Sequence, residues 1–248
     1  MTKERDWRKP YPIDIDLAEK ILRGVNAKRM FLVEDYAVAN VFRQLMTTRS
    51  AEFLPACVVI LDALWKTRMY EIETEREAVC RSLEKHWSMI LQTLDGMKEF
   101  DIGSVPTGVF SSAQDLFPLI LQAEGRLKRN YSFCTKFFHW TTRVHFPIVD
   151  AFSRKSVNRL QVESGDGKDA IKADATTSPA GNYVDEYFLW VTFYSGLMNS
   201  IPATDGERLV KADYDSQGLP ERMENTLLRA LDKILYASKG RHRLAAGS

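Results

Sequence analysis

Residues 131–160, YSFCTKFFHWTTRVHFPIVDAFSRKSVNRL, carry the most structural information in this sequence. Their first part has the three- and four-residue spacing of an amphipathic helix, and Lys136 stands beside the apolar stripe formed by Phe133, Phe137 and Trp140. Pro147 cannot continue a helix, and it pushes the residue before it toward an extended backbone. The sequence therefore predicts a helix, then a connector over RVHFP, and then a second helix.

Asp150 stands at the start of that second helix, DAFSRKSVNRL. A carboxylate at this position can accept hydrogen bonds from free backbone N–H groups and is favoured by the helix dipole. Arg154 lies one turn further on, within reach of an ion pair with Asp150. From spacing alone, Asp150 is either a helix cap paired with Arg154 or a functional carboxylate.

Length and composition place the chain among ordinary globular proteins. It has 248 residues, 45% of them hydrophobic and 27% charged, which fits one large domain or two closely packed ones. The net charge of +1 gives no global argument for nucleic acid, so such a function would need a local basic patch. The charged N-terminus, the absence of a long apolar run and three widely separated cysteines predict a cytoplasmic protein without disulfides, outside the membrane.

The rest of the chain predicts helices. Three- and four-residue apolar spacing indicates helices over residues 14–25, 33–46, 51–70 and 71–94, with Asp14 or Asp16 as the first cap. A helix broken or started near Pro118 is expected, with further helices over 183–201 and from Pro220 to Gly240. The polar, glycine-containing segment 163–182 is expected to be a loop. The prediction is an all-α protein, with an N-terminal helical region over 1–100 and a second helical region over 101–248.

The central stretch resembles the helix-hairpin-helix DNA glycosylase superfamily, in particular its bacterial branch with an 8-oxoguanine DNA glycosylase (OGG)-like fold. The resemblance is carried by SFCTK at 132–136, FPIVD at 146–150 and RALDKILY at 229–236. In that superfamily a glycine-containing hairpin of the form LPGVGxK grips the DNA backbone and leads to a catalytic aspartate. Ser132 and Cys134 stand where the family has the hairpin glycines, and the interval from lysine to aspartate is shorter here.

The resemblance implies a helix-hairpin-helix DNA-glycosylase-like helical bundle and an enzyme that removes a damaged or modified base from duplex DNA, with or without lyase activity. It places Asp150 at the catalytic carboxylate and Lys136 at the hairpin lysine, which some members use as nucleophile. Base excision needs a carboxylate to stabilise the sugar cation and a nucleophile, which is water or an amine. A lysine in such a role must be desolvated or placed by a cation, whereas an ordinary lysine is a solvated helix residue.

A phosphate-binding surface is a natural use for the densest basic region of the chain. We expect DNA contacts from Ser132 and from seven cations: Arg126, Lys128, Arg129, Arg143, Arg154, Lys155 and Arg159. A solvated helix face is the alternative. His139 and His145 lack partners at metal-ligand spacing, so neither a metal nor another cofactor is predicted. The aromatic residues over 183–194 fit a core helix better than a base pocket.

The sequence therefore supports two hypotheses. The first is a DNA-binding protein that resembles a base-excision glycosylase. The second is a catalytically inert helical component that binds nucleic acid or a protein partner, for example in a bacterial defence or toxin–antitoxin system. They differ in whether Asp150 faces a substrate or serves only its own helix.

Overall fold

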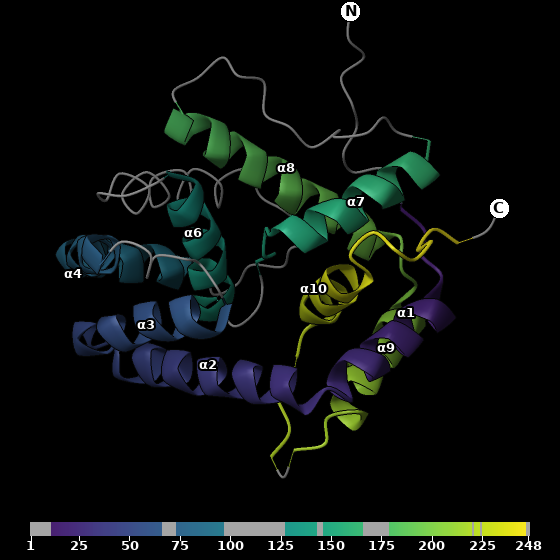
Figure 1. The fold of residues 1–248 in the computed structure, drawn as a ribbon, viewed down its shortest axis with the longest axis horizontal. Helices are drawn as coiled ribbons and strands as arrows, with labels where there is room; N and C mark the ends of the chain where they lie inside the picture. Colours follow the sequence, from purple (N-terminus) through teal and green to yellow (C-terminus); the bar gives the residue numbers. More distant parts are fainter. Residues whose placement is uncertain are drawn as a thin grey trace, which may run out of the picture.

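A computed structural model of the chain describes residues 11–65, 73–96, 127–142, 146–165, 179–219, 221–223 and 225–246. These residues form nine α-helices and no strand, which confirms the all-α prediction. The helices are α1 (Ile15–Asn26), α2 (Arg29–Thr48), α3 (Leu54–Trp65), α4 (Glu73–Gly96), α6 (Leu127–Thr141), α7 (Ala151–Glu163), α8 (Pro179–Asn199), α9 (Ala203–Asp215) and α10 (Leu227–Ser238), with a 3₁₀ turn at Ala51–Phe53 (Figure 1).

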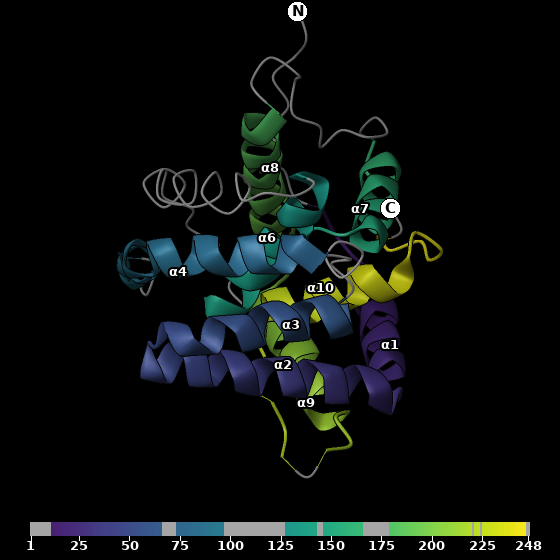
Figure 2. The same cartoon turned by 60° about the vertical axis from the view of Figure 1, so that its left-hand side comes forward.

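The helices pack as two groups that share one core. The long helices α2, α3 and α4 are stacked one on the next, and α6 packs against α2 and α3 (Figures 1 and 2). In the other group α10 packs against α1, α7 and α9, while α8 contacts both α6 and α10. The first helix therefore joins the last two, and packing does not follow the division of the chain at residue 100.

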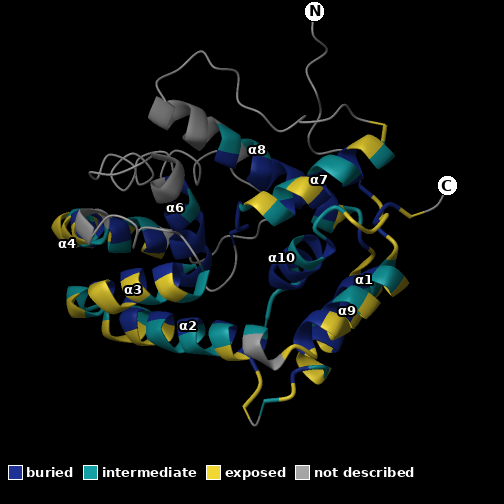
Figure 3. Cartoon of the chain, in the orientation of Figure 1, coloured by how far each residue is buried: buried dark blue, intermediate teal, exposed yellow. Residues whose placement is uncertain are grey.

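Apolar side chains from every described helix meet in a single buried cluster. Figure 3 colours the buried residues of these helices dark blue. The predicted stripe on α6 is part of it, since Phe133, Phe137 and Trp140 are all buried. The aromatic residues of α8 whose side chains the structure describes are buried as well, which confirms the core-helix interpretation: Tyr187, Trp190, Phe193 and Tyr194. Burial of large apolar side chains is the main stabilising term in such a core.

Charged side chains of α10 also enter this core. The Arg229 guanidinium donates to Asp35 Oδ2 at 2.6 Å, and Lys233 Nζ donates to Asp213 Oδ1 at 2.8 Å. Asn26 Nδ2 donates to the same Asp213 oxygen at 2.8 Å. These bonds tie α10 to α1, α2 and α9, and each buried charge has an opposite charge beside it.

The two ends of the described chain pair with each other. Ile13 and Ala245 form an isolated antiparallel bridge. Asp14 N donates to Leu244 O at 2.8 Å, and Ala246 N donates to Pro12 O at 3.1 Å. Leu244 is buried, so this short pairing closes one side of the core.

Two helix starts differ from the sequence prediction, and one helix was not predicted. α8 begins at Pro179, inside the segment 163–182 predicted as a loop, because proline has the backbone angle of a first helical residue. α10 begins at Leu227 rather than at Pro220, since Thr226 caps it and its hydroxyl accepts from Arg229 N at 3.2 Å. α9 was not predicted at all, because only a few apolar residues mark its buried side.

Other helices match their predictions. Asp14 caps α1 and accepts from Leu17 N at 3.0 Å, as its position indicated. The apolar segment after residue 51 is helical rather than a strand. The helix expected near Pro118 and the residues 143–145 of the connector lie outside the described residues. Among the helices that the structure describes, none has the length and apolar character needed to cross a membrane.

Candidate functional site

Asp150 caps α7, and it uses one of its two carboxylate oxygens to do so. Oδ1 accepts from Phe152 N at 2.7 Å and from Ser153 N at 2.8 Å, and Ser153 Oγ in turn accepts from Asp150 N at 3.1 Å. This reciprocal pair is a capping box. Within the described part of the chain Oδ2 accepts no hydrogen bond, and Asp150 is only half-buried. One oxygen is thus fixed by the helix while the other is available.

Buried side chains hold both carbonyl groups at the start of the connector that leads to Asp150. His139 Nδ1 of α6 lies 2.6 Å from Phe146 O, and Tyr187 OH of α8 donates to Pro147 O at 2.9 Å. Because a carbonyl can only accept, His139 carries its proton on Nδ1 in this arrangement. The proline prevents helical pairing here, and side chains from two helices supply the missing partners.

The N–H groups of the connector are held in the same way. Ile148 N donates to Asp232 Oδ2 of α10 at 3.3 Å, and Val149 N donates to Thr135 Oγ1 of α6 at 3.4 Å. Three helices therefore contribute one or more hydrogen bonds to four consecutive residues. This network fixes the backbone on which Asp150 is carried.

Lys136 is buried on α6 within electrostatic range of Asp150. Its Nζ donates to Trp65 O at 2.5 Å, and the residue is 5% exposed. Burial lowers the pKa of Lys136 to about 8, against the opposing influence of Asp150 and Asp62. An amine with this pKa is partly neutral near physiological pH, which an ordinary solvated lysine is not.

Asp232 is a second carboxylate beside the connector, and it is buried. Tyr194 OH donates to its Oδ1 at 2.6 Å, and His139 Nδ1 lies 3.6 Å from its Oδ2. Burial raises the pKa of Asp232 to about 7, although Arg229 and the Tyr194 hydrogen bond act in the opposite direction. The charge of Asp150 contributes to the increase. The two carboxyl groups are thus electrostatically coupled.

Arg154 and Arg159 make internal contacts. The Arg154 guanidinium forms an ion pair with Glu186 of α8 rather than with Asp150, and it lies 5.6 Å from the ring centre of Trp190. Arg159 Nε donates to Glu163 at 2.7 Å and Nη1 donates to Gly240 O at 2.8 Å. Of the three cations predicted on α7, Lys155 is the one that is exposed.

The hairpin that the resemblance implied is not formed at residues 132–136. These residues lie inside the continuous helix α6, because Ser132 and Cys134 replace the glycines that such a turn requires. Ser132 is half-buried on that helix. Lys128 and Arg129 belong to the first turn of α6, but their side chains, like residues Arg126 and Arg143, lie outside the described part of the chain.

Sequence reasoning missed the groups that hold the connector. Thr135, Tyr187 and Asp232 come from three helices, and no spacing in the chain brings them together. The available signal was an aspartate beside the buried leucines of α10, Leu228, Leu231 and Leu235, since a buried carboxylate needs partners. His139, one of the two histidines for which the sequence predicts no metal, is buried.

The described residues show no group of three or more histidine, cysteine, aspartate or glutamate side chains arranged to hold a metal ion. All three cysteines are free thiols, and burial raises the pKa of Cys57 to about 12. That thiol is therefore a poor nucleophile at neutral pH. The chemically useful groups in this region are the carboxylate of half-buried Asp150 and the Lys136 amine.

The comparisons with known proteins add no family assignment. No protein-family model matches the sequence, and no curated protein or solved structure is significantly similar to it.

Proposed function

We propose that this protein binds DNA and removes a base by cleaving its N-glycosidic bond, with Asp150 as the carboxylate that stabilises the sugar cation. The observation that carries the proposal is that the two oxygens of the Asp150 carboxylate differ in their hydrogen bonding. Oδ1 accepts the capping hydrogen bonds of α7, while Oδ2 accepts none among the described residues. Capping and catalysis are therefore compatible in the same side chain.

The reaction needs a fixed negative charge near C1′ of the sugar. When the C1′–N bond breaks, its electron pair leaves with the base and positive charge develops on the sugar ring. A carboxylate held in advance stabilises that charge without reorganising during the reaction. The side-chain hydrogen bonds to Phe146, Pro147, Ile148 and Val149 support this role, because they restrict the backbone that carries Asp150.

Lys136 supplies a candidate nucleophile. A lysine attacks only as the neutral amine, and burial lowers the pKa of Lys136 to about 8. Attack on C1′ would form a new C–N bond as the base leaves, and loss of a proton from the nitrogen with ring opening would give an imine. Such an intermediate is the route to strand cleavage in addition to base release.

A second function is favoured by a different observation. Lys136 Nζ is bonded to Trp65 O, and Asp150 completes a capping box, so both residues also have structural roles. An inert protein that binds nucleic acid or a protein partner through the same fold would need nothing more from them. Base release distinguishes the two functions.

The first test is Asp150→Asn assayed on oligonucleotides with oxidised, deaminated and alkylated bases. Loss of the charge should raise the barrier by about 2–4 kcal/mol, which lowers the rate of base release by about two to three decades. Folding should be nearly unchanged, since asparagine caps a helix as well as aspartate does. Asp14→Asn is the matched control, because it removes the same charge from the cap of α1.

The Lys136→Gln variant tests the nucleophile. Borohydride should trap wild-type protein on the substrate oligonucleotide, and the variant should not be trapped. A variant that still releases base but forms no trapped complex would show that water is the nucleophile. If the wild-type protein releases no base from the whole panel, the base-excision proposal is wrong and the inert function remains.

A further inference from the structure

The turn after α10 is fixed against α7. Gly240 N donates to Ser156 Oγ at 2.9 Å, and Arg159 Nη1 donates to Gly240 O. Gly240 has φ +69°, and a Cβ at this position would lie 3.0 Å from Lys155 O. Only glycine fits this close approach without a shift, so the turn and α7 present one continuous surface.

Cations outnumber carboxylates on this surface, where Glu163 pairs with Arg159 and accepts from Ala245 N at 3.3 Å. Residues 151–162 and 237–246 contain Arg154, Lys155, Arg159, Lys239, Arg241 and Arg243 and no aspartate or glutamate. Arg154 and Arg159 form the ion pairs with Glu186 and Glu163 described above. Within the residues that the structure describes, the other four form no ion pair, and Lys155, Arg241 and Arg243 are exposed. We call Lys155, Lys239, Arg241 and Arg243 the cationic surface.

Two of these cations share one aromatic ring. Lys239 Nζ lies 4.6 Å and Lys155 Nζ 5.9 Å from the ring centre of Phe152. Contact with the ring stabilises each ammonium group, but bringing two like charges together is unfavourable. An anion bound beside this ring would offset both positive charges.

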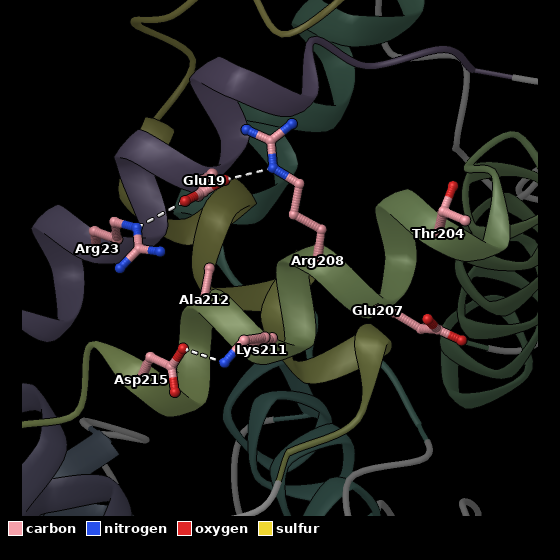
Figure 4. A pocket seen from close by; sticks show the side chains of 8 residues that line it. All are labelled: Glu19, Arg23, Thr204, Glu207, Arg208, Lys211, Ala212 and Asp215. Carbon is pink, nitrogen blue, oxygen red and sulfur yellow. Dashed lines mark hydrogen bonds and ion pairs between the residues drawn. The ribbon is translucent and has the colours of Figure 1, made fainter.

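The groove between α1 and α9 shows the opposite arrangement of charge (Figure 4). There Arg208 bridges Asp16 and Glu19, at 2.6 and 2.7 Å, and Lys211 pairs with Asp215 at 2.7 Å. Its cations are neutralised by the protein itself. The cationic surface therefore differs from an ordinary charged helix face of this same molecule.

The cationic surface begins next to Asp150. Phe152 contacts the two lysines through its ring, and its backbone N–H donates to Asp150 Oδ1. Phe152 packs edge-on against Tyr236 with ring centres 5.2 Å apart. Burial, and then the charge of Asp150, raise the pKa of Tyr236, so that ring lies within range of the carboxylate. A polymer with regularly spaced negative charges could contact both features at once.

We infer that the cationic surface binds the phosphate backbone of the DNA strand whose base reaches Asp150. The inference rests on the proposed function, and it assigns the strand contacts to the turn after α10 as well as to α7. An anionic membrane is disfavoured because the aromatic rings here are half-buried beneath the lysines and cannot insert into lipid. DNA phosphates need only the exposed cations.

The test is binding of a fluorescein-labelled duplex of about 20 base pairs, with salt varied between about 50 and 200 mM. Replacing Lys155, Lys239, Arg241 and Arg243 together by glutamine should lower the affinity at least about tenfold and flatten the salt slope by about two to four. The matched control replaces four exposed cations of α1, α2 and α4 by glutamine: Lys20, Arg43, Arg81 and Lys85. Both variants lose four positive charges. Because only the first variant loses them from the cationic surface, only the control should keep the wild-type salt slope.

Equal loss of affinity in both variants would overturn the inference, because the effect would then come from net charge. Unchanged binding by the first variant would overturn it as well. If vesicles with phosphatidylserine bind the wild-type protein and duplex DNA does not, the partner is a membrane and the inference is wrong. Base release is measured separately, so selective loss of binding without any base release would support the surface while rejecting base excision.

Discussion

Two sets of buried titratable side chains lie within the same core. They differ in whether an opposite charge lies beside them and in how their pKa values are shifted. Around Arg229 and Lys233 each charge has an opposite charge within 2.6–2.8 Å. Burial alone would raise the pKa of Asp213, but Lys233 and two asparagines lower it overall. Around the connector, Lys136 and Asp232 are buried without a charged hydrogen-bond partner among the described residues, and their pKa values move to about 8 and about 7.

The difference indicates a structural role for the first set and a functional role for the second. Buried ions that are paired and hydrogen-bonded stay charged and hold helices in register, although they add little net stability. Buried groups whose pKa values are moved toward neutrality reduce stability when they carry charge, and they cluster at functional sites. Asp150 influences the pKa of both members of the second set, and Arg229 of the first set also acts to lower the pKa of Asp232. Stability measurements can test this distinction.

The largest effect is expected from breaking the compensated set. Asp35→Ala leaves the Arg229 guanidinium buried without its partner and should lower the free energy of unfolding by about 3–5 kcal/mol at pH 7. Urea denaturation measures it. The double variant Asp35→Leu with Arg229→Met removes both charges and should recover most of the loss. A double variant as unstable as Asp35→Ala would show that the pair itself stabilises the fold.

A smaller effect, with a definite pH dependence, is expected at Asp232. Its folded pKa of about 7 is above the unfolded value, so its contribution to stability is present at low pH and is lost as pH rises from about 4 to 7. Over that range the stability of Asp232→Asn relative to wild type should rise by on the order of 2–4 kcal/mol. Parallel pH profiles of the two proteins would place the titration elsewhere.

The smallest effect has the opposite pH direction. The folded pKa of Lys136 is below its unfolded value, so the unfolded state binds more protons and wild-type stability should increase as pH rises from about 8 to 10.5. Lys136→Met should be more stable than wild type at pH 7 by about 1–3 kcal/mol, after subtracting the lost bond to Trp65 O. A Lys136→Met variant less stable than wild type would mean that Lys136 is a structural residue like Arg229.

The helices of this fold could be predicted from the sequence because apolar spacing and end residues act locally. Asp14 and Asp150 each precede a run with helical periodicity, and each caps that helix in the structure. α9 escaped prediction since its buried side consists of few residues, Leu209 and Ala212 among them. Local patterns specify helices well when the buried side is wide and poorly when it is narrow.

The site was predicted only in part, because its partners are distant in the chain. Lys136 and Asp150 were identified from one stretch, and the structure places them within electrostatic range of each other. The ion pair of Arg154 with Glu186 and the bond of Asp232 to Ile148 span 32 and 84 residues. No periodicity encodes such pairs, so the predicted partner of Arg154 was wrong and Asp232 was missed.

The packing of α1 on α9 and α10 sets the order in which this chain can complete its fold during synthesis. α1 ends at Asn26, whereas α10 begins at Leu227, roughly 200 residues later. At about 5–20 residues per second the ribosome needs roughly 10–40 s to make that interval. Until α9 and α10 are made, α1 lacks its two most extensive native partners and has mainly the smaller contact with α2. A nascent chain of this protein is therefore a natural client for chaperones that cover exposed amphipathic helices.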